Sequence, residues 1–320
     1  MNMSNELRLT QHLHAQALLR QNAASRFQKI NQQYDKTDPR LKEELKNIVL
    51  KKLSETKKLA LILVDIQNDF VLEDFALYAP GGEHTLFRNM ALLDAVSELI
   101  IDYPRLGHHL EIITTQDAHV FQRTLDNIDA QIMLQSYGIV HTQKTLKIEH
   151  NELLPFNPHK GQYGLHCLNG TIGAAISQPI EERLKNLKEN IPIYRFAKIN
   201  FSAPEAGMKL KEKIELSDPQ FLNTGNPIYD ESALSFLQFF HNQAYSELML
   251  TGICGNICVQ QAAEGLAAAG EKVCILDPCV HYLIIPGINS YDEVWTAVQH
   301  AYAEQGILTI ELPHFRSNPE

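Results

Sequence analysis

The sequence of 320 residues predicts an α/β protein with a doubly wound, mostly parallel sheet and helices on both faces. From residue 59 onward, short apolar runs alternate with longer stretches of helical periodicity, which is the pattern of parallel strands joined by helical crossovers. No fixed-period repeat and no low-complexity tract interrupts this alternation. With 44% hydrophobic and 21% charged residues, the chain has the composition of a globular protein with a sizeable core.

Each predicted element has a clear apolar or amphipathic pattern. The predicted strands are 59–64, 110–115, 192–197, 248–252, 272–276 and 307–312. The predicted helices are roughly 86–101, 180–189, 231–243, 257–269 and 290–304. The connection from about 120 to 165 shows no regular pattern, and loops of this length are usually functional or mobile.

The first 58 residues differ in charge from the rest of the chain. They carry 12 lysines and arginines against 6 aspartates and glutamates, whereas residues 59–320 carry 16 against 32. We therefore expect a basic helical extension, 1–58, before one α/β domain, 59–320. Its apolar residues Leu41, Leu45, Ile48 and Leu53 lie near helical spacing, so the extension is expected to pack on the body or on a second subunit, giving a possible homo-oligomer. A nucleic-acid partner is not expected, because aromatic residues are scarce among the basic ones.

The cysteines and the apolar runs indicate the compartment. Five cysteines without a CxxC spacing suggest a reducing environment rather than a disulfide framework. The longest uninterrupted apolar run, 59–64, is far shorter than a membrane-spanning helix requires, and the N-terminus lacks the features of a secretory signal. A cytoplasmic protein with no membrane partner is expected.

Chemically useful residues follow several predicted strands. They are Asp65, Asp117, His119, Lys198 and Cys258. Because ligands of open parallel sheets bind beyond the carboxyl ends of the strands, we expect these side chains at one rim.

Cys258 is the candidate nucleophile. It opens a predicted helix, where the positive end of the helix dipole lowers a thiol pKa, and a nearby Lys198 would act in the same direction. Backbone N–H groups of Cys254 and Cys258, in a turn of small residues, can face a developing oxyanion. Asp65 can accept the thiol proton and deliver it to a leaving nitrogen. The alternative is a buried cysteine that acts only as a small hydrophobic residue.

Two stretches carry a family resemblance. VDIQNDFV (64–71), followed by APGGEH (79–84), resembles the opening of the isochorismatase-like cysteine hydrolases, and GICGNICVQQAAEGLAAAG (252–270) resembles their nucleophile segment. The resemblance covers roughly 59–312 and leaves 1–58 unmatched. It implies that Asp65, Lys198 and Cys258 form a catalytic triad.

TTQDAH (114–119) and HCLNGTIGA (166–174) are similar to nicotinamidase segments that bind a divalent metal. The resemblance implies that Asp117, His119 and His166 hold one ion, for which mixed nitrogen and oxygen ligands permit Zn, Fe or Mn. No organic cofactor is expected. Without the resemblance, the residues alone favour a solvated strand end over metal binding for Asp117 and His119.

In nicotinamidases the metal holds the pyridine nitrogen and aromatic side chains sandwich the ring. Phe70 and Tyr163 stand at two such positions, and core packing is the alternative for both. His141, His150 and His159 lie in the long connection, and no role is assigned to them.

The sequence departs from nicotinamidases in several places. Ala118 and Val120 stand where an aromatic residue and a proline are usual, and GTIGA replaces GTPGA. Segments 120–165 and 204–230 match nothing in the family, although they would shape the pocket wall.

The expected function is metal-assisted hydrolysis of a small aromatic amide, with nicotinamide to nicotinate and ammonia as the leading case in NAD salvage, through a thioester on Cys258. Two alternatives remain open. One is another hydrolase of the same superfamily, acting on a different amide or on a vinyl ether. The other is a non-catalytic scaffold that presents residues 1–58 to a partner.

Overall fold

A computed structural model gives the arrangement of the chain, and it describes residues 5–35, 38–117, 166–167, 171–198, 209–211, 236–285 and 287–315. Seven strands form one sheet in the order β4-β3-β2-β1-β5-β6-β7. They are β1 (Leu59–Val64), β2 (Leu110–Asp117), β3 (Ile193–Lys198), β4 (Lys209–Lys211), β5 (Glu247–Ile253), β6 (Val273–His281) and β7 (Leu308–Ile310). Six of these strands pair in parallel, and β4 pairs antiparallel with β3 at one edge.

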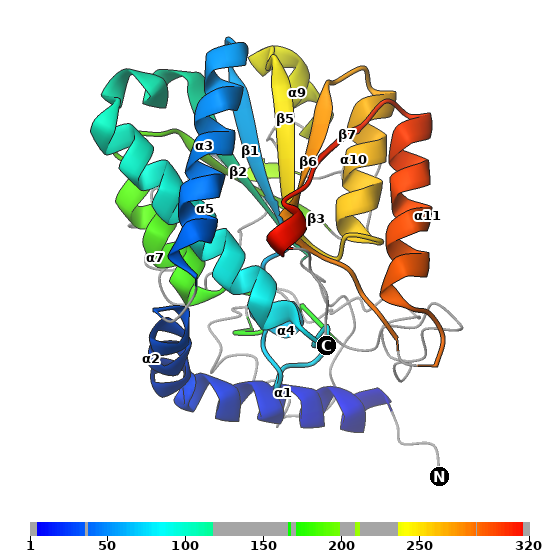
Figure 1. Cartoon of the computed structure of the whole chain (residues 1–320). Helices are drawn as coiled ribbons and strands as arrows, with labels where there is room; N and C mark the ends of the chain where they lie inside the picture. The colour runs from blue at the N-terminus through cyan, green and yellow to red at the C-terminus, as the bar shows by residue number, and fades with distance from the viewer. Residues whose placement is uncertain are drawn as a thin grey trace.

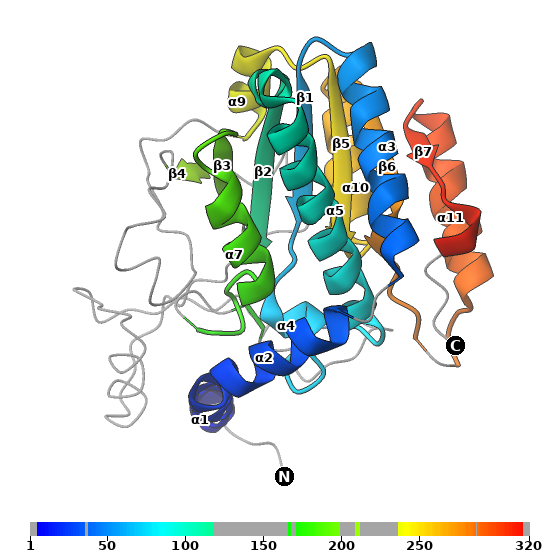
Figure 2. The same ribbon diagram turned by 60° about the vertical axis from the view of Figure 1, so that its left-hand side comes forward.

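Helices cover both faces of this sheet, as Figures 1 and 2 show. One face carries α3 (Pro39–Glu55), α5 (Gly82–Asp102) and α7 (Gln178–Leu187). The other carries α9 (Phe236–Gln243), α10 (Cys258–Ala268) and α11 (Tyr291–Glu304). The shorter elements of the described residues are α4 (Asn68–Val71), η1 (Pro104–His109) and η4 (Pro313–Phe315). The predicted doubly wound, mostly parallel fold is confirmed.

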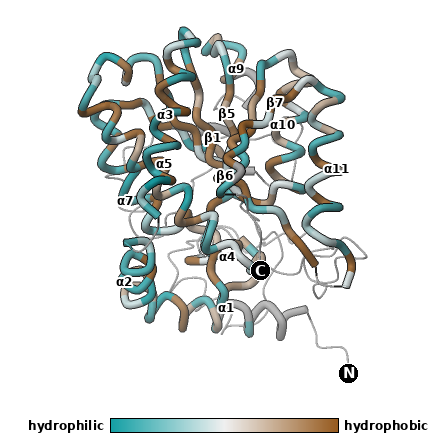
Figure 3. The backbone as a smooth tube through the Cα atoms, in the orientation of Figure 1, coloured by the Kyte–Doolittle hydropathy of each residue, from teal (hydrophilic) through white to brown (hydrophobic). Residues whose placement is uncertain are grey.

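The two layers of the core follow from the alternation of side chains along β1. Leu59, Leu61 and Leu63 pack with α3, α5 and α7, whereas Ala60 and Ile62 pack with α9, α10 and α11. All six residues of β1 are buried, as expected for a central strand covered on both faces. Figure 3 shows the same organisation: hydrophobic residues are concentrated in the central strands, and the outer helices carry hydrophilic residues.

The register of the strands brings their carboxyl ends to one edge. Val64 of β1 lies opposite Thr115 of β2 and Gly252 of β5. Asp117, the last residue of β2, lies opposite Lys198, the last residue of β3. The residues that follow these strands therefore start from neighbouring positions at the same rim.

Two strands differ from the sequence-based expectation. The predicted strand 272–276 continues to His281, because its pairing with β5 shifts register between Leu250 and Gly252 and accommodates Pro278. The short edge strand β4 was not predicted, since three residues carry too little pattern to recognise.

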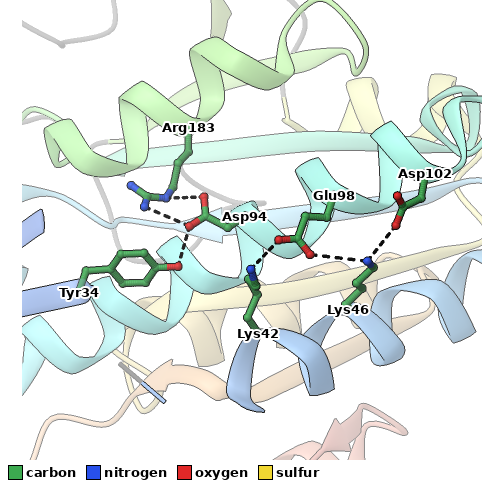
Figure 4. Close-up of polar contacts among 7 residues, drawn as sticks. All are labelled: Tyr34, Lys42, Lys46, Asp94, Glu98, Asp102 and Arg183. Atoms are coloured by element: carbon green, nitrogen blue, oxygen red, sulfur yellow. Dashed lines mark hydrogen bonds and ion pairs between the residues drawn. The ribbon is translucent and has the colours of Figure 1, made fainter. Parts of the chain in front are cut away.

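The N-terminal segment forms three helices, α1 (Asn5–Gln21), α2 (Ala23–Tyr34) and α3. Leu41, Leu45, Val49 and Leu53 of α3 are buried in the same hydrophobic cluster as β1 and α5. Figure 4 shows polar contacts that reinforce this packing. The Tyr34 hydroxyl donates to Asp94 at 2.6 Å. The segment is thus packed on the body, and the boundary at 58/59 stays a prediction.

Among the described helices, none is both long and apolar enough to cross a membrane.

Candidate active site

Asp65 directly follows β1 and has a sparsely populated backbone conformation. Its φ of 54° lies in the left-handed region, which aspartate tolerates better than most residues. The side chain is buried, and its Oδ1 accepts a hydrogen bond from the Thr115 hydroxyl of β2 at 2.7 Å. Strained residues of this kind persist where surrounding contacts hold them, and they concentrate at functional sites.

The next polar side chains, Gln67, Asn68 and Asp69, are also buried, and each binds the backbone of a distant segment. The Gln67 side-chain amide donates to the carbonyls of Asp117 at 2.6 Å and Ala174 at 2.7 Å. Asn68 donates to the carbonyl of residue 172 at 2.7 Å. This loop after β1 therefore fixes β2 and the segment after residue 170 by hydrogen bonds rather than by apolar packing.

Asp117 and His166 come together although 49 positions separate them in the sequence. The Nε2 of His166 lies 3.2 Å from the Oδ2 of Asp117, and both side chains are almost fully buried. The His166 ring also lies against Phe70, with ring centroids 5.8 Å apart. A carboxylate oxygen and an imidazole nitrogen this close fit two ligands of one divalent ion.

Cys258 is the first residue of α10, at the end of a tight turn. The Cys254 carbonyl accepts hydrogen bonds from the backbone N–H groups of Ile257 and Val259, both at 3.0 Å. After this turn, α10 begins at Cys258, so its N-terminus lies at the rim. The Cys258 thiol therefore lies at the positive end of the helix dipole. The Cys258 residue is 6% exposed.

One cavity of about 170 Å³ is lined by Asp117, His166 and Cys258, whereas Asp65 is not among its lining residues. Five of its lining residues are sequence-predicted site residues: Phe70, Asp117, His166, Cys254 and Cys258. The remaining wall is mainly apolar and comes from segments 77–80 and 283–285, together with Ile253 and Ile257. The cavity therefore suits a mainly apolar ligand that has a few polar atoms, which the Cys258 thiol and the Asp117–His166 pair can contact.

A second cysteine, Cys167, lies close to this cluster but does not line the cavity. Burial raises the pKa of its thiol well above the ordinary value, and the charges of Asp69, Asp117 and Asp65 raise the pKa further. A thiol with such a pKa is a poor nucleophile. Of these two thiols, only Cys258 lines the cavity.

Some predicted site residues cannot be placed. His119, Tyr163 and the loop histidines His141, His150 and His159 lie outside the described residues. Lys198 is described as the last residue of β3, opposite Asp117, and its side chain is outside the description. Within the described part of the chain, no three His, Cys, Asp or Glu side chains gather around one metal position.

Sequence reasoning missed several residues that shape the site. The stretch VDIQNDFV contains Gln67 and Asp69, and no role was expected for them, although polar residues directly after a buried strand indicate hydrogen bonding to other segments. The wall at 283–285 was missed because the predicted strand before it ends too early. Gln16 also reaches this region, where its side chain contacts Asp69.

The fold and the site define a doubly wound α/β protein with a cysteine at the first position of a helix and a carboxylate–imidazole pair in one mainly apolar cavity. No protein-family model and no curated protein sequence matches the chain.

Solved structures of nicotinamidases and isochorismatase-like hydrolases are similar in fold. A nicotinamidase/pyrazinamidase from Bacillus subtilis is 18% identical, with 79% of this chain and 100% of that chain covered and a TM-score of 0.48. An isochorismatase-like hydrolase from Alkaliphilus metalliredigens is 16% identical, with coverages of 79% and 94% and a TM-score of 0.43. A pyrazinamidase of Pyrococcus horikoshii in complex with zinc is 17% identical, with coverages of 80% and 99% and a TM-score of 0.43.

Proposed function

We propose that the protein is a metal-assisted cysteine amidohydrolase that hydrolyses a small aromatic amide, with nicotinamide as the leading candidate. The supporting observation is the convergence of Cys258, Asp117, His166 and Phe70 on one cavity with largely apolar walls. Such a cavity accommodates a flat ring, which Phe70 can contact through its π face or edge. The Cys258 thiol and the Asp117–His166 pair then lie near the few polar atoms of the substrate.

In the proposed reaction, the Cys258 sulfur attacks the carboxamide carbon, and its proton passes to Asp65. Backbone N–H groups of Cys254 and Cys258 stabilise the oxyanion. Asp65 returns the proton to the leaving nitrogen, the carbon–nitrogen bond breaks, and ammonia departs. Water then attacks the thioester with Asp65 as base, which releases the carboxylate and regenerates the thiol. Lys198 orients Asp65 and favours the thiolate.

Asp117 and His166, with His119 as the third ligand expected from the sequence, would hold the divalent ion. When bound, the ion supplies a Lewis acid that can orient a ring nitrogen of the substrate. Asp117 is suited to this role because Gln67 fixes its backbone on both sides, at the N–H and at the carbonyl.

An ammonia-release assay tests the proposal. Nicotinamide and benzamide differ only by the ring nitrogen, so we expect turnover of nicotinamide to exceed that of benzamide by about tenfold or more. Cys258→Ala is expected to lower kcat about a thousandfold or more. The matched control is Cys274→Ala, which removes a buried thiol from β6 that does not line the cavity.

Different outcomes separate the alternatives. Equal turnover of both amides, with no metal in the purified protein, would favour another hydrolase of the superfamily. Absence of thiol-dependent turnover for every amide tested would contradict the proposal and favour a binding or scaffold role.

A further inference from the structure

His166 depends on a backbone conformation that needs external support. The residue that follows it, Cys167, has a φ of 45°, in the left-handed region. A non-glycine residue in this region is strained and is retained only where its surroundings hold it. The direction in which His166 enters the cavity is therefore sensitive to whatever fixes the backbone at Cys167.

Asp69 provides this support. Its Oδ2 accepts a hydrogen bond from the Cys167 backbone N–H at 2.6 Å. Its Oδ1 accepts one from the N–H of Ala76 at 3.2 Å. The side chain is completely buried, so these bonds form away from competing water and each is correspondingly strong.

Gln16 of α1 completes the arrangement around Asp69. Its Nε2 donates to the Asp69 Oδ1 at 3.1 Å, and its Oε1 accepts from the Gly173 N–H at 2.9 Å. Gln16 is only 1% exposed, so its amide is buried with both ends bonded. The Asp69 N–H in turn donates to the Gly173 carbonyl at 2.9 Å, which closes a ring of three residues.

Helix α1 is held in place by the rest of the N-terminal segment. Figures 1 and 2 show α1 lying across the carboxyl-end side of the sheet, next to α4, which contains Asp69. Phe27 and Ile30 of α2 are buried in the body's core, and Arg26 forms an ion pair with Asp74. The extension that the family resemblance leaves unmatched thus inserts one polar side chain beneath the site.

We propose that Gln16 is a positioning residue of the active site, acting through Asp69 and Cys167 to fix the His166 imidazole. The inference rests on the proposed function only in assigning His166 to a divalent metal. With this role for Gln16, the N-terminal extension helps to position a residue of the site in addition to covering the hydrophobic core. Partners that orient a ligand without touching the ion commonly change metal affinity by about 10–100-fold when they are removed.

Zinc binding to the full-length protein tests this inference by competition with a chromophoric chelator. Gln16→Met keeps the length of the side chain but removes both hydrogen bonds, and Gln11→Met places the same substitution at an exposed position of α1. We expect Gln16→Met to raise the zinc dissociation constant about tenfold or more and Gln11→Met to leave it unchanged. The melting temperature of the metal-free protein is measured alongside.

A purely structural role for Gln16 would lower the melting temperature without changing the affinity of the folded protein, and that result would overturn the inference. If Gln16→Met yields too little folded protein, Gln16→Asn makes the same comparison, because it keeps a neutral amide but is one methylene too short to bond both Asp69 and Gly173.

The two proposals fail differently. Zinc binding with no amide turnover contradicts the proposed function alone. Equal zinc affinity of wild type and Gln16→Met contradicts the positioning role alone. A wild-type protein that binds no zinc contradicts the positioning role and the metal-dependent part of the function.

Discussion

The Gln67 side chain forms a pair of hydrogen bonds with the backbone of Asp117. Its Nε2 donates to the Asp117 carbonyl at 2.6 Å, and its Oε1 accepts from the Asp117 N–H at 2.8 Å. A side-chain amide bonded in this way replaces a strand partner at the end of β2. It holds the residue that faces His166 in a fixed orientation.

The substitution Gln67→Glu should therefore disturb the site. The introduced carboxylate would keep the acceptor for the Asp117 N–H but would place an oxygen against the carbonyls of Asp117 and Ala174. We expect kcat/KM for nicotinamide to fall about tenfold or more. Gln21→Glu, at an exposed position, serves as the control. A kcat/KM within about twofold of wild type would show that this clamp does not matter for activity.

Gly173 lies so close to Asp69 that no side chain fits. A Cβ built on Gly173 would lie 2.1 Å from the Asp69 Oδ1. Gly173→Ala should displace the carboxylate, lower the free energy of unfolding by about 1–3 kcal/mol and weaken zinc binding. Gly270→Ala is the comparison, because its φ of +90° is unfavourable for alanine but nothing lies within 4 Å of the added carbon, whereas at Gly173 only the contact with Asp69 disfavours alanine. Equal zinc affinity of the two variants would contradict this expectation.

The third helix of the N-terminal segment is expected to be essential for folding. Leu45 of α3 is fully buried against the body, so Leu45→Ala should lower the free energy of unfolding by about 2–5 kcal/mol. Leu18→Ala, at a side chain that is 48% exposed in α1, should change it by less than about 1 kcal/mol. Urea denaturation measures both variants, and a loss below about 1 kcal/mol for Leu45→Ala would mean that α3 is only loosely attached.

His281 should make the protein less stable in acid. Burial lowers the pKa of this residue to about 4, and its ring donates to the Pro80 carbonyl. Between about pH 6.5 and pH 4 the unfolded chain binds a proton at this histidine that the folded chain does not, so stability falls as the pH falls. The loss by about pH 4.5 is roughly 2–3 kcal/mol.

The His281→Asn variant tests this pH dependence. Urea unfolding at about pH 7.5 and about pH 4.5 should show a smaller difference for His281→Asn than for wild type. His108→Asn, at an exposed position, should retain the wild-type difference. Identical pH dependence in wild type and His281→Asn would show that other groups cause the loss of stability in acid.

Much of the fold could be predicted because its pattern is local. The alternation of apolar runs and helical stretches defined six of the strands, and the residues after them lie at one rim because parallel strands share a direction. The predicted helix 257–269 agrees with α10 to within one residue at each end. Strand β4 and the extension of β6 escaped prediction, since pairing partners rather than local pattern decide short and bulged strands.

The sequence by itself determined the fold class and which residue types stand after each strand, because periodicity and strand direction are properties of the local chain. Only the tertiary structure decided that Gln16 lies against Asp69, 53 positions away, and that His166 faces Asp117. Helical periodicity identifies the apolar face of a helix. The partner of a single buried polar side chain depends on how the helices dock, which the local pattern does not contain.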